Sequence, residues 1–485
     1  MRHVSLPLED LKVWAHFNDV QLFETSIEPH IVREDGNDKG GGLLATGEHG
    51  PGQPLVAVPH ELVLSKERVE QYAKADQSLK ELVEAAASLV QSPRTTVLLF
   101  LIYQMTINNS SSHGHGLGFN NPFAGYVKML PDAIPLPTFY TAEERELLIG
   151  TSLSEALEQK VISLEREFDS LKAATAKIPW CQEIWWSESA DCLTFEDWKL
   201  ADAMYRSRAL ELPQGVGVGM VPVIDMANHA SDDRYNARFE VDEDSGSVLL
   251  VVRDDRIVHK GDEITIMYGC GGACEMIFSY GFLEEHASSA REIFLSLSIP
   301  SDDPLRLAKV RFAQEAPGVR IYVDDSDQVR WESTFVWWAC INEEDGLDFR
   351  VEQTIDGGTE LKALWKDNAL ASDTSLQSIL LADRLRDIFV LRAVVTIQAR
   401  IEEQGSRLAG HEEQYNNTVC SDQVRDSVYG AIGKLRSLEM ELLTRAYQTL
   451  EEEKAQLLES TIVHDFLAQV QGGTESPGRT PDDFS

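Results

Sequence analysis

The chain has 485 residues and a formal net charge of -37, from 80 acidic and 43 basic side chains. This length allows two or more domains with sizeable cores. The acidic balance argues against nucleic acid as a partner, because phosphate binding needs clustered Lys and Arg. A basic protein partner would be attracted to such a surface, and solubility explains the charge equally well.

Cysteine usage and hydropathy give the expected compartment. The six cysteines are irregularly spaced, which is typical of a reducing environment. Cys270 and Cys274 form the one close pair, no Cys or His nearby completes a zinc quartet, and we expect no metal. The N-terminus lacks a basic-then-apolar leader, and the longest apolar run, 97–105, is too short to span a bilayer. We expect a cytoplasmic or nuclear protein, or both, that does not bind membranes.

The first part of the chain predicts a helix and two strands. Residues 8–30 carry apolar side chains at helical spacing, followed by an apolar run. Two short strands, within 39–46 and 54–59, are joined by the turn residues 50–53. The run Gly40–Gly42 could be an ordinary flexible turn. It does not form a phosphate loop, because no Gly-Lys-Ser/Thr follows it and no helix begins there.

The next part, up to residue 205, is predominantly helical. Residues 65–105 follow a helical pattern. A low-complexity loop at 108–121 contains His113 and His115, which we interpret as residues of a surface loop rather than metal ligands. Amphipathic helices over 153–205 carry four tryptophans. We expect these indoles to pack in a core rather than to form a recognition surface.

Polar residues then follow apolar, strand-like runs in a region we expect to be buried. A loop is predicted over 214–219, and a hairpin joins two β-prone runs across the turn 242–247. Three motifs surround this hairpin. They are Val-Pro-Val-Ile-Asp-Met-Ala-Asn-His at 221–229, Gly-Asp-Glu-Ile-Thr-Ile-Met-Tyr-Gly at 261–269 and Tyr-Gly-Phe at 280–282.

The C-terminal part predicts one strand and two long helices. Residues 293–299 form a strand-like run, and 306–356 are acidic and mixed in character. The two helices would pack antiparallel and bury their apolar stripes. The stripes are Leu381, Leu385, Ile388, Leu391 and Val395, and then Val424, Val428, Ile432, Leu435, Leu438, Leu442 and Leu450. Residues 471–485 have the composition of a disordered tail.

The three motifs at 221–282 resemble the C-terminal half of a SET domain, in the branch typified by the plant Rubisco large-subunit methyltransferase. Two earlier patterns of that branch are also present. The residues that match them are Pro122, Tyr126, Leu130, Pro131, Gly150, Thr151 and Leu153, with Phe123 where Trp is usual. We interpret them as packing residues of an inserted helical subdomain.

The resemblance implies an α+β fold in two domains. Residues 1–285 would form a mostly-β SET core of short strands with a threaded pseudoknot. Its strands would lie at about 30–95 and 205–285, with a helical insertion at about 95–204. Residues 290–470 would form an all-α substrate-binding domain.

The resemblance also implies an activity. Members of this branch transfer methyl groups from S-adenosylmethionine to protein lysines. We therefore expect a lysine N-methyltransferase acting on a basic, non-histone intracellular protein, such as a ribosomal protein or a translation factor. Two alternatives stay open: methylation of histidine, and a non-catalytic interaction scaffold. The scaffold is suggested by Ala273 and Leu210, which stand where the family usually has Asn and Phe.

Site residues follow from the same resemblance. Tyr268 is the expected catalytic residue and Tyr280 the lining of the lysine channel, while Asp225 either orients the substrate amine or caps a strand. Arg208 could instead be a structural arginine paired with an acid. The residues expected to bind the cofactor are Gly40, Gly41, Gly42, Arg208, Asn228, His229 and Phe282. Methyl transfer requires a neutral amine, whereas a free lysine has a pKa of about 10.4. An aromatic, apolar passage would favour the neutral form.

Overall fold

The computed structural model describes residues 3–32, 39–109, 116–188, 192–213, 215, 217–231, 234–269, 271–313, 317–353, 358–370, 376–418 and 423–473. The chain divides into two compact units. Unit 1 comprises 1–140, 157–270 and 278–281, and unit 2 comprises 141–156, 271–277 and 282–485. The predicted domain boundary between 285 and 290 rests on motifs alone and stays a prediction. The predicted loop histidines His113 and His115 lie outside the described residues, as does most of the predicted tail.

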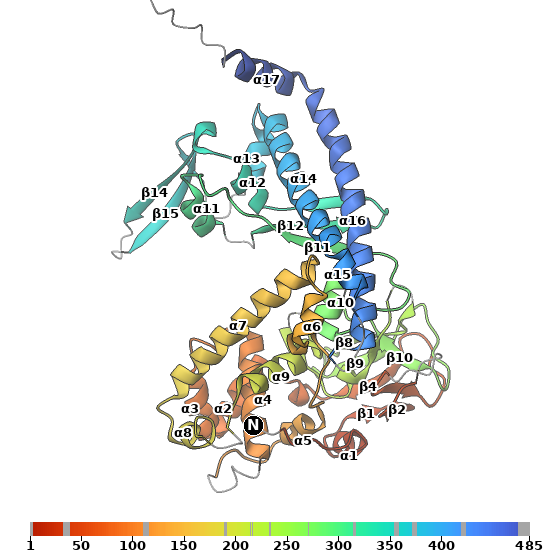
Figure 1. The fold of residues 1–485 in the computed structure, drawn as a ribbon. Helices are drawn as coiled ribbons and strands as arrows, with labels where there is room; N and C mark the ends of the chain where they lie inside the picture. The colour runs from red at the N-terminus through yellow and green to blue at the C-terminus, as the bar shows by residue number, and fades with distance from the viewer. Residues whose placement is uncertain are drawn as a thin grey trace, which may run out of the picture. The chain divides into compact units, whose positions relative to one another are not determined.

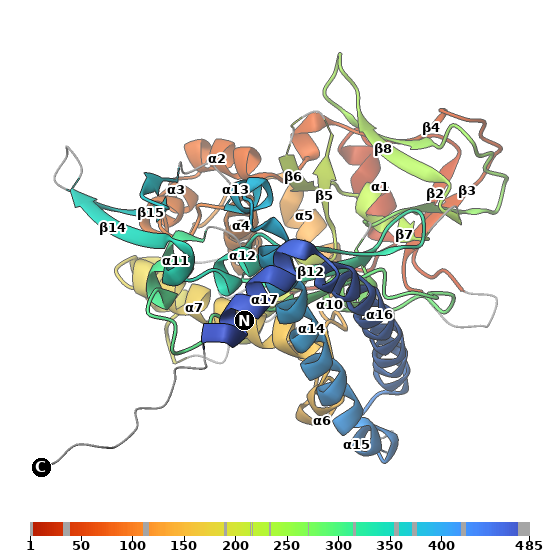
Figure 2. The same cartoon turned by 90° about the horizontal axis from the view of Figure 1, so that it is seen from above.

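Runs of helices and runs of short strands follow one another along the described chain (Figures 1 and 2). The α-helices are α1 (Asp10–Phe17), α2 (Lys66–Ala75), α3 (Gln77–Ala85), α4 (Pro93–Asn108), α5 (Pro122–Met129), α6 (Ala142–Glu146), α7 (Ser152–Thr175), α8 (Pro179–Ile184), α9 (Phe195–Arg206), α10 (Ala273–Tyr280), α11 (Arg306–Phe312), α12 (Phe335–Cys340), α13 (Leu376–Ala382), α14 (Arg386–Gly410), α15 (Glu412–Asn416), α16 (Asp426–Leu458) and α17 (Thr461–Gly473). No helix of the described ranges combines the length and apolarity needed to cross a membrane.

The strands form small sheets. They are β1 (Gln21–Leu22), β2 (Thr25–Glu28), β3 (Gly42–Ala45), β4 (Pro54–Val58), β5 (Ala209–Leu212), β6 (Gly217–Met220), β7 (Asn228–His229), β8 (Ala237–Val241), β9 (Val248–Val252), β10 (Glu263–Ile266), β11 (Glu292–Ser296), β12 (Gly318–Val323), β13 (Val329–Glu332), β14 (Leu347–Gln353), β15 (Thr359–Trp365) and β16 (Asn368–Ala369). Short 3-10 turns lie at His60–Leu62, Pro137–Phe139, Ile224–Met226 and Glu343–Asp345.

Unit 1 contains two four-stranded sheets, in the orders β1-β4-β9-β8 and β2-β3-β10-β7, and the hairpin β5-β6. The two four-stranded sheets share an apolar core that includes Leu43, Val56 and Ile264, all fully buried. The predicted hairpin is confirmed, with Val241 paired to Val248. Its turn is held by the Asp242 carboxylate, which accepts hydrogen bonds from the backbone and side chain of Ser245.

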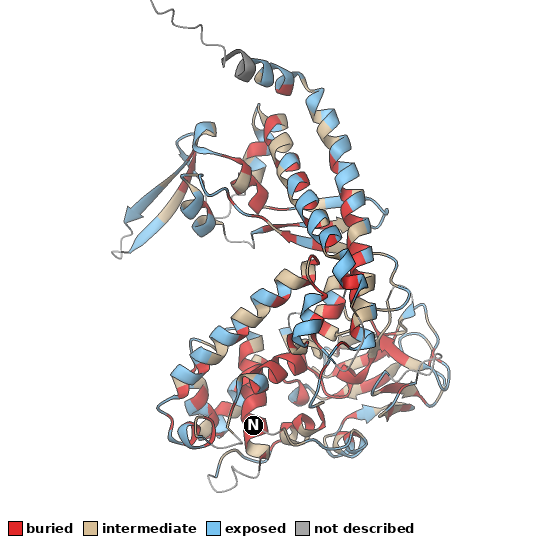
Figure 3. Cartoon of the chain, viewed as in Figure 1, coloured by how far each residue is buried: buried red, intermediate tan, exposed pale blue. Residues whose placement is uncertain are grey.

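The helices of unit 1 surround α4. This helix begins with Ser92 as its cap and Pro93 in its first turn, and its residues from Thr95 to Thr106 are buried. Burial on all sides explains its uninterrupted apolar sequence. Figure 3 shows the buried residues of α4 in red. As predicted, tryptophans contribute to this core: Trp180, Trp185 and Trp198 are buried, and Trp186 packs against them.

Unit 2 contains the pair of long helices that the apolar stripes predicted. Helices α14 and α16 pack against each other over many residues (Figure 1). The stripe predicted on α16 is correct, since its members from Val428 to Leu450 are buried or nearly so. On α14 the predicted stripe is correct at Ile388, which is buried, and wrong at Val395, which is exposed. Leu381, also exposed, lies on α13, and the buried face of α14 continues through Phe389, Ala393, Ile397 and Ile401.

Three local predictions need correction. The α+β class is confirmed, but the C-terminal region is not all-α, because it carries the sheets β11-β12-β13 and β14-β15-β16 beside its helices. The helix predicted from residue 8 ends at Phe17, and Thr25–Glu28 is a strand. The loop predicted at 214–219 gives way to β6 from Gly217.

Candidate functional site

One sheet of unit 1 brings three sequence motifs together. Strand β10 pairs in parallel with β7, so that Thr265 lies opposite Asn228 and Ile266 lies opposite His229. On its other edge β10 pairs antiparallel with β3, which begins at Gly42. The glycine run, the Asn-His pair and the segment leading to Tyr268 therefore meet on neighbouring strands. More than 180 residues of the chain lie between β3 and β7.

Tyr268 sits directly after β10 and contacts the Asn-His segment. Its hydroxyl group donates a hydrogen bond to the Ala227 carbonyl at 3.0 Å. Its backbone N–H donates to Nδ1 of His229 at 3.1 Å. Because Nδ1 accepts this bond, a neutral His229 ring carries its proton on Nε2. Burial raises the pKa of Tyr268, so the phenol stays protonated at neutral pH.

Tyr280 completes a pair of phenols. Its ring centroid lies 4.5 Å from that of Tyr268, with the two planes at 37°. The Tyr280 hydroxyl donates to the Tyr268 carbonyl at 3.3 Å. Gly281, which follows, has a φ of 80°, and a Cβ there would lie 2.7 Å from the Pro135 carbonyl oxygen. The close approach of this turn to Pro135 therefore requires glycine.

The glycine run lies against Asn228. The Asn228 amide donates to the Gly41 carbonyl at 3.3 Å and to Glu263 Oε1 at 2.9 Å. A Cβ on Gly41 would lie 2.7 Å from Met226 Cε, and one on Gly42 would lie 2.8 Å from Asn228 Nδ2. A side chain at either position would therefore force these neighbouring side chains to shift.

Arg208 and Asp225 form an ion pair beside this segment. Arg208 Nη1 lies 3.3 Å from Asp225 Oδ2 and 3.2 Å from the Asp225 carbonyl oxygen. Tyr126, from α5, donates its hydroxyl to the same Oδ2 at 2.5 Å. The Asp225 side chain is fully buried. Burial raises the pKa of its carboxyl, and the Arg208 guanidinium and the Tyr126 hydroxyl oppose that effect.

Two polar atoms of this ion pair have no hydrogen-bond partner. Among the described residues, Asp225 Oδ1 and Arg208 Nε are both buried and unpaired. Buried polar groups in folded proteins are nearly always paired, so an exception needs an explanation. The unpaired acceptor, Asp225 Oδ1, and the unpaired donor, Arg208 Nε, could both bind a polar ligand or an ordered water.

The backbone just before Asp225 is strained. Val223 has φ 74° and ψ -49°, although its side chain is β-branched and fully buried. Such a conformation costs on the order of 1–3 kcal/mol. It leads into the 3-10 turn Ile224–Met226, which places the Asp225 carboxylate and the Met226 sulfur next to Arg208. Strain of this kind clusters at functional sites.

The predicted residues thus fall into two groups. Gly41, Gly42, Asn228, His229, Tyr268, Tyr280, Arg208 and Asp225 are linked through the contacts given above, and Gly40, with a φ of 82°, precedes the half-buried Gly41 and the buried Gly42. Phe282 belongs to unit 2 and is partly buried. Ala273, the departure from the family pattern, is buried at the start of α10, and its N–H donates to the Ala290 carbonyl.

The sequence alone gave no functional role to Tyr126, Glu263 or Lys39. Tyr126 was expected only to pack, yet its hydroxyl is bound to Asp225. Glu263 accepts hydrogen bonds from Asn228 and from Lys39, at 2.9 and 2.5 Å. The tyrosine gave no signal in one sequence, because its partner is 99 residues away. The Gly-Asp-Glu motif could have pointed to Glu263.

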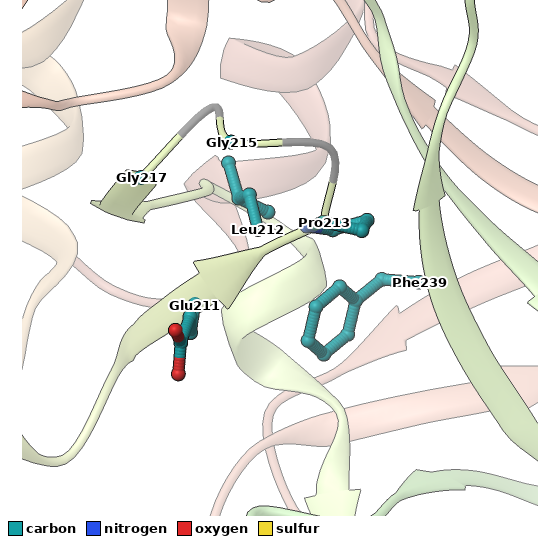
Figure 4. A pocket seen from close by; sticks show the side chains of 6 residues that line it. All are labelled: Glu211, Leu212, Pro213, Gly215, Gly217 and Phe239. Carbon is teal, nitrogen blue, oxygen red and sulfur yellow. The ribbon is translucent and has the colours of Figure 1, made fainter.

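An open depression lies elsewhere on unit 1 (Figure 4). It is lined by Glu211, Leu212, Pro213, Gly215, Gly217 and Phe239. None of the predicted site residues lines it. Among the described residues, no group of three or more His, Cys, Asp or Glu is arranged to hold a metal ion.

Comparison with known proteins places the fold. No protein-family model matches the sequence. The chain is 27% identical to SET domain-containing protein 8 of Schizosaccharomyces pombe, over 88% of this chain and 92% of that protein. The structure of Rubisco LSMT bound to AdoMet superposes with a TM-score of 0.63 at 17% identity, covering 97% of this chain and 98% of that one. The fold is that of the Rubisco-methyltransferase branch of SET proteins.

Other relatives of this chain match over part of their length. N-lysine methyltransferase setd6 of Xenopus tropicalis is 24% identical, over 59% of this chain and 60% of that protein. The Rubisco large-subunit N-methyltransferase of Nicotiana tabacum is 23% identical, over 64% of this chain and 58% of that protein. The predicted family resemblance and fold class are thereby confirmed.

Proposed function

We propose that this SET protein is an S-adenosylmethionine-dependent protein-lysine N-methyltransferase. The observation that carries the proposal is the linkage of Tyr268 to the glycine run through the segment Ala227–Asn228. The Tyr268 hydroxyl binds the Ala227 carbonyl, and the next residue, Asn228, binds the Gly41 carbonyl. Several relatives are named lysine N-methyltransferases, which supports lysine over histidine as the acceptor.

The residues present fit the cofactor. S-adenosylmethionine supplies a methyl group on a positively charged sulfur when it is bound. Nothing lies within 4 Å of the Cβ position of Gly40, and Arg208 Nε and Asp225 Oδ1 are polar atoms without a partner among the described residues. Gly40, Gly41, Gly42, Arg208, Asn228 and His229 would hold the cofactor.

The two phenols would prepare the acceptor amine. Tyr268 and Tyr280 provide adjoining aromatic walls, and burial keeps the Tyr268 hydroxyl protonated. An apolar passage favours the neutral amine over the ammonium ion, because burial penalises the charged form. The hydroxyl groups would then orient the nitrogen lone pair. Since the displacement needs little covalent help from the protein, such positioning supplies much of the catalysis.

The substrate and its location extend the proposal. A net charge of -37 favours a basic protein as the substrate. Opposite charges would attract the two proteins over a distance, and added salt would weaken this attraction. We propose a basic, non-histone protein of the cytoplasm or the nucleus, with ribosomal proteins and translation factors as the first candidates by analogy.

The test is methylation of a cell lysate by the purified protein and isotope-labelled S-adenosylmethionine. We expect labelled bands, and mass spectrometry of the labelled peptides should locate the methyl group on lysine. Tyr268→Phe should abolish labelling. A matched control, Tyr322→Phe on β12 of unit 2, should leave it unchanged. Absence of labelling from every lysate, despite tight cofactor binding, would instead support the non-catalytic scaffold.

A further inference from the structure

The helical insertion contributes a hydroxyl group to the site. Helix α5 is capped by the side chain of Asn121, which accepts a hydrogen bond from the Ala124 N–H at 3.1 Å. The Trp14 indole donates to the Pro122 carbonyl at 2.8 Å. These contacts fix the helix that carries Tyr126, whose ring centroid lies 6.0 Å from that of Trp14. Tyr126 is only 2% exposed, so its hydroxyl group needs a buried partner.

That partner is the Asp225 carboxylate. The Tyr126 hydroxyl lies 2.5 Å from Oδ2, whereas Arg208 Nη1 lies 3.3 Å from the same oxygen. The neutral phenol therefore makes the shorter contact. A hydrogen bond to a carboxylate favours its charged form, which opposes the effect of burial on the pKa of Asp225. The titratable groups that face Asp225 are Tyr126 from α5, Arg208 from the segment before β5, and Tyr268 after β10.

The position of Arg208 depends on Asp225 in turn. Its Nη1 contacts the Asp225 carboxylate and carbonyl oxygens and, at 3.5 Å, the Met226 sulfur. Its Nε has no partner among the described residues, and neither has Asp225 Oδ1. A shift of the carboxylate would therefore move both open atoms together.

We propose that Tyr126 is a positioning residue of the site: its hydroxyl group holds the Asp225 carboxylate, and through it Arg208, in the arrangement that receives the methyl donor. This inference rests on the proposed function and assigns to the helical insertion a direct part in cofactor binding. Tyr126 touches neither reactant in this scheme and acts through Asp225.

The test compares two buried tyrosines. Tyr126→Phe should weaken the binding of S-adenosylmethionine, measured by calorimetry, by about tenfold. Tyr103→Phe is the matched control, because the Tyr103 hydroxyl also lies in a fully buried residue and donates to a carboxylate, that of Asp76, at 2.9 Å. Both variants should lose thermal stability to a similar extent. The control should keep the cofactor affinity of the parent.

The pH dependence of binding separates positioning from stability. The ionised Asp225 supports Arg208, so affinity should fall as the pH drops through the pKa of this carboxyl. Without the Tyr126 hydroxyl that pKa is higher, and the fall should occur at a higher pH. In Asp225→Asn this component should disappear. Adding Tyr126→Phe to Asp225→Asn should change the affinity less than it does in the parent, because both act through one contact.

The outcomes distinguish this inference from the proposed function. If the parent protein does not bind S-adenosylmethionine, the proposed function itself fails. If the parent binds but Tyr126→Phe matches it in affinity and pH profile, only the role of Tyr126 is overturned. Fully additive effects of the Tyr126 and Asp225 substitutions would overturn it as well. Should Tyr126→Phe not fold, Asp225→Asn and its pH profile still test the dependence on the carboxylate.

Discussion

Each unit contains a buried carboxylate near an arginine, and the two sites differ in how fully their polar atoms are paired. In unit 2, Glu439 accepts hydrogen bonds from the backbone N–H and the hydroxyl group of Ser152, and Arg436 lies one turn earlier on α16. Neither residue has an unpaired buried polar atom in the described structure. In unit 1, Asp225 and Arg208 each have one. A fully paired network indicates a structural role, whereas a partly paired one indicates a place for a ligand.

The paired network joins a loop to the long helices of unit 2. Arg436 donates to the Ile149 carbonyl at 2.8 Å, and Gln404 donates to the Gly150 carbonyl at 2.6 Å. Gly150 has a φ of 89°, and a Cβ there would lie 2.8 Å from the Arg407 carbonyl oxygen. Gly150 is therefore a packing residue, as predicted, but it packs within unit 2 and not within the predicted helical insertion. The contacts of this loop are with α14 and α16 of unit 2.

The largest expected effect is at Tyr268. Replacing it with Phe removes a hydroxyl group that is oriented on the Ala227 carbonyl. Loss of one preorganised polar group lowers kcat by about 10²- to 10³-fold. Calorimetry should show cofactor affinity within a few-fold of the parent, and thermal unfolding should change little. If the variant kept the full turnover of the parent, Tyr268 would not be catalytic and the assignment of the reactive site to unit 1 would be wrong.

Glu439→Gln should lower stability without changing cofactor binding, whereas Tyr268→Phe should lower turnover without changing stability. An amide group cannot accept both bonds from Ser152, so the variant should lose about 1–3 kcal/mol of unfolding free energy. Cofactor affinity should stay unchanged. Exposed Glu441→Gln, on the same helix, removes the same charge and serves as the control. Equal stability of the two variants would contradict the structural role.

The pH dependence of stability should also identify Glu439. Burial raises the pKa of its carboxyl to about 7, above the ordinary value of 4.5. Between these values the folded state binds more protons than the unfolded state. This group therefore stabilises the fold fully below its unfolded pKa, and the contribution is lost as the pH rises towards about 7. Denaturant unfolding at several pH values should show this component in the parent and not in Glu439→Gln.

The smallest effects are expected from substitutions at two neighbouring glycines. A Cβ on Gly41 would lie 2.7 Å from Met226 Cε and 2.4 Å from Leu8 Cδ2, whereas a Cβ on Gly40 would meet nothing within 4 Å. Gly41→Ala should therefore disturb the Met226 side of the site and weaken cofactor binding by about tenfold. Gly40→Ala should cost only about 1 kcal/mol of stability, from its positive φ. Equal effects on binding would show that contact with Met226 is unimportant.

Local patterns predicted much of the fold. The hairpin around 242–247 followed from turn residues between β-prone runs, and the stripe on α16 followed from helical spacing. Both signals lie within a short stretch of chain. The stripe on α14 was partly misplaced because the aromatic Phe389 and the small Ala393 face its partners, and apolar residues outside that face confused the spacing. The strands β14 and β15 were missed although their residues alternate, with Leu347, Phe349 and Val351 apolar between polar neighbours in β14.

The sequence by itself determined the family resemblance, the Asn-His pair, the two tyrosines and the glycine run, because each is a short motif with a fixed order. Only the tertiary structure decided which groups complete the site. The Tyr126 hydroxyl reaches Asp225 across 99 residues, and the two unpaired atoms of the ion pair arise from that packing. Which polar groups find hydrogen-bond partners depends on contacts between segments that are distant in the chain. The periodicity and spacing of residues therefore do not predict which buried polar groups remain unpaired.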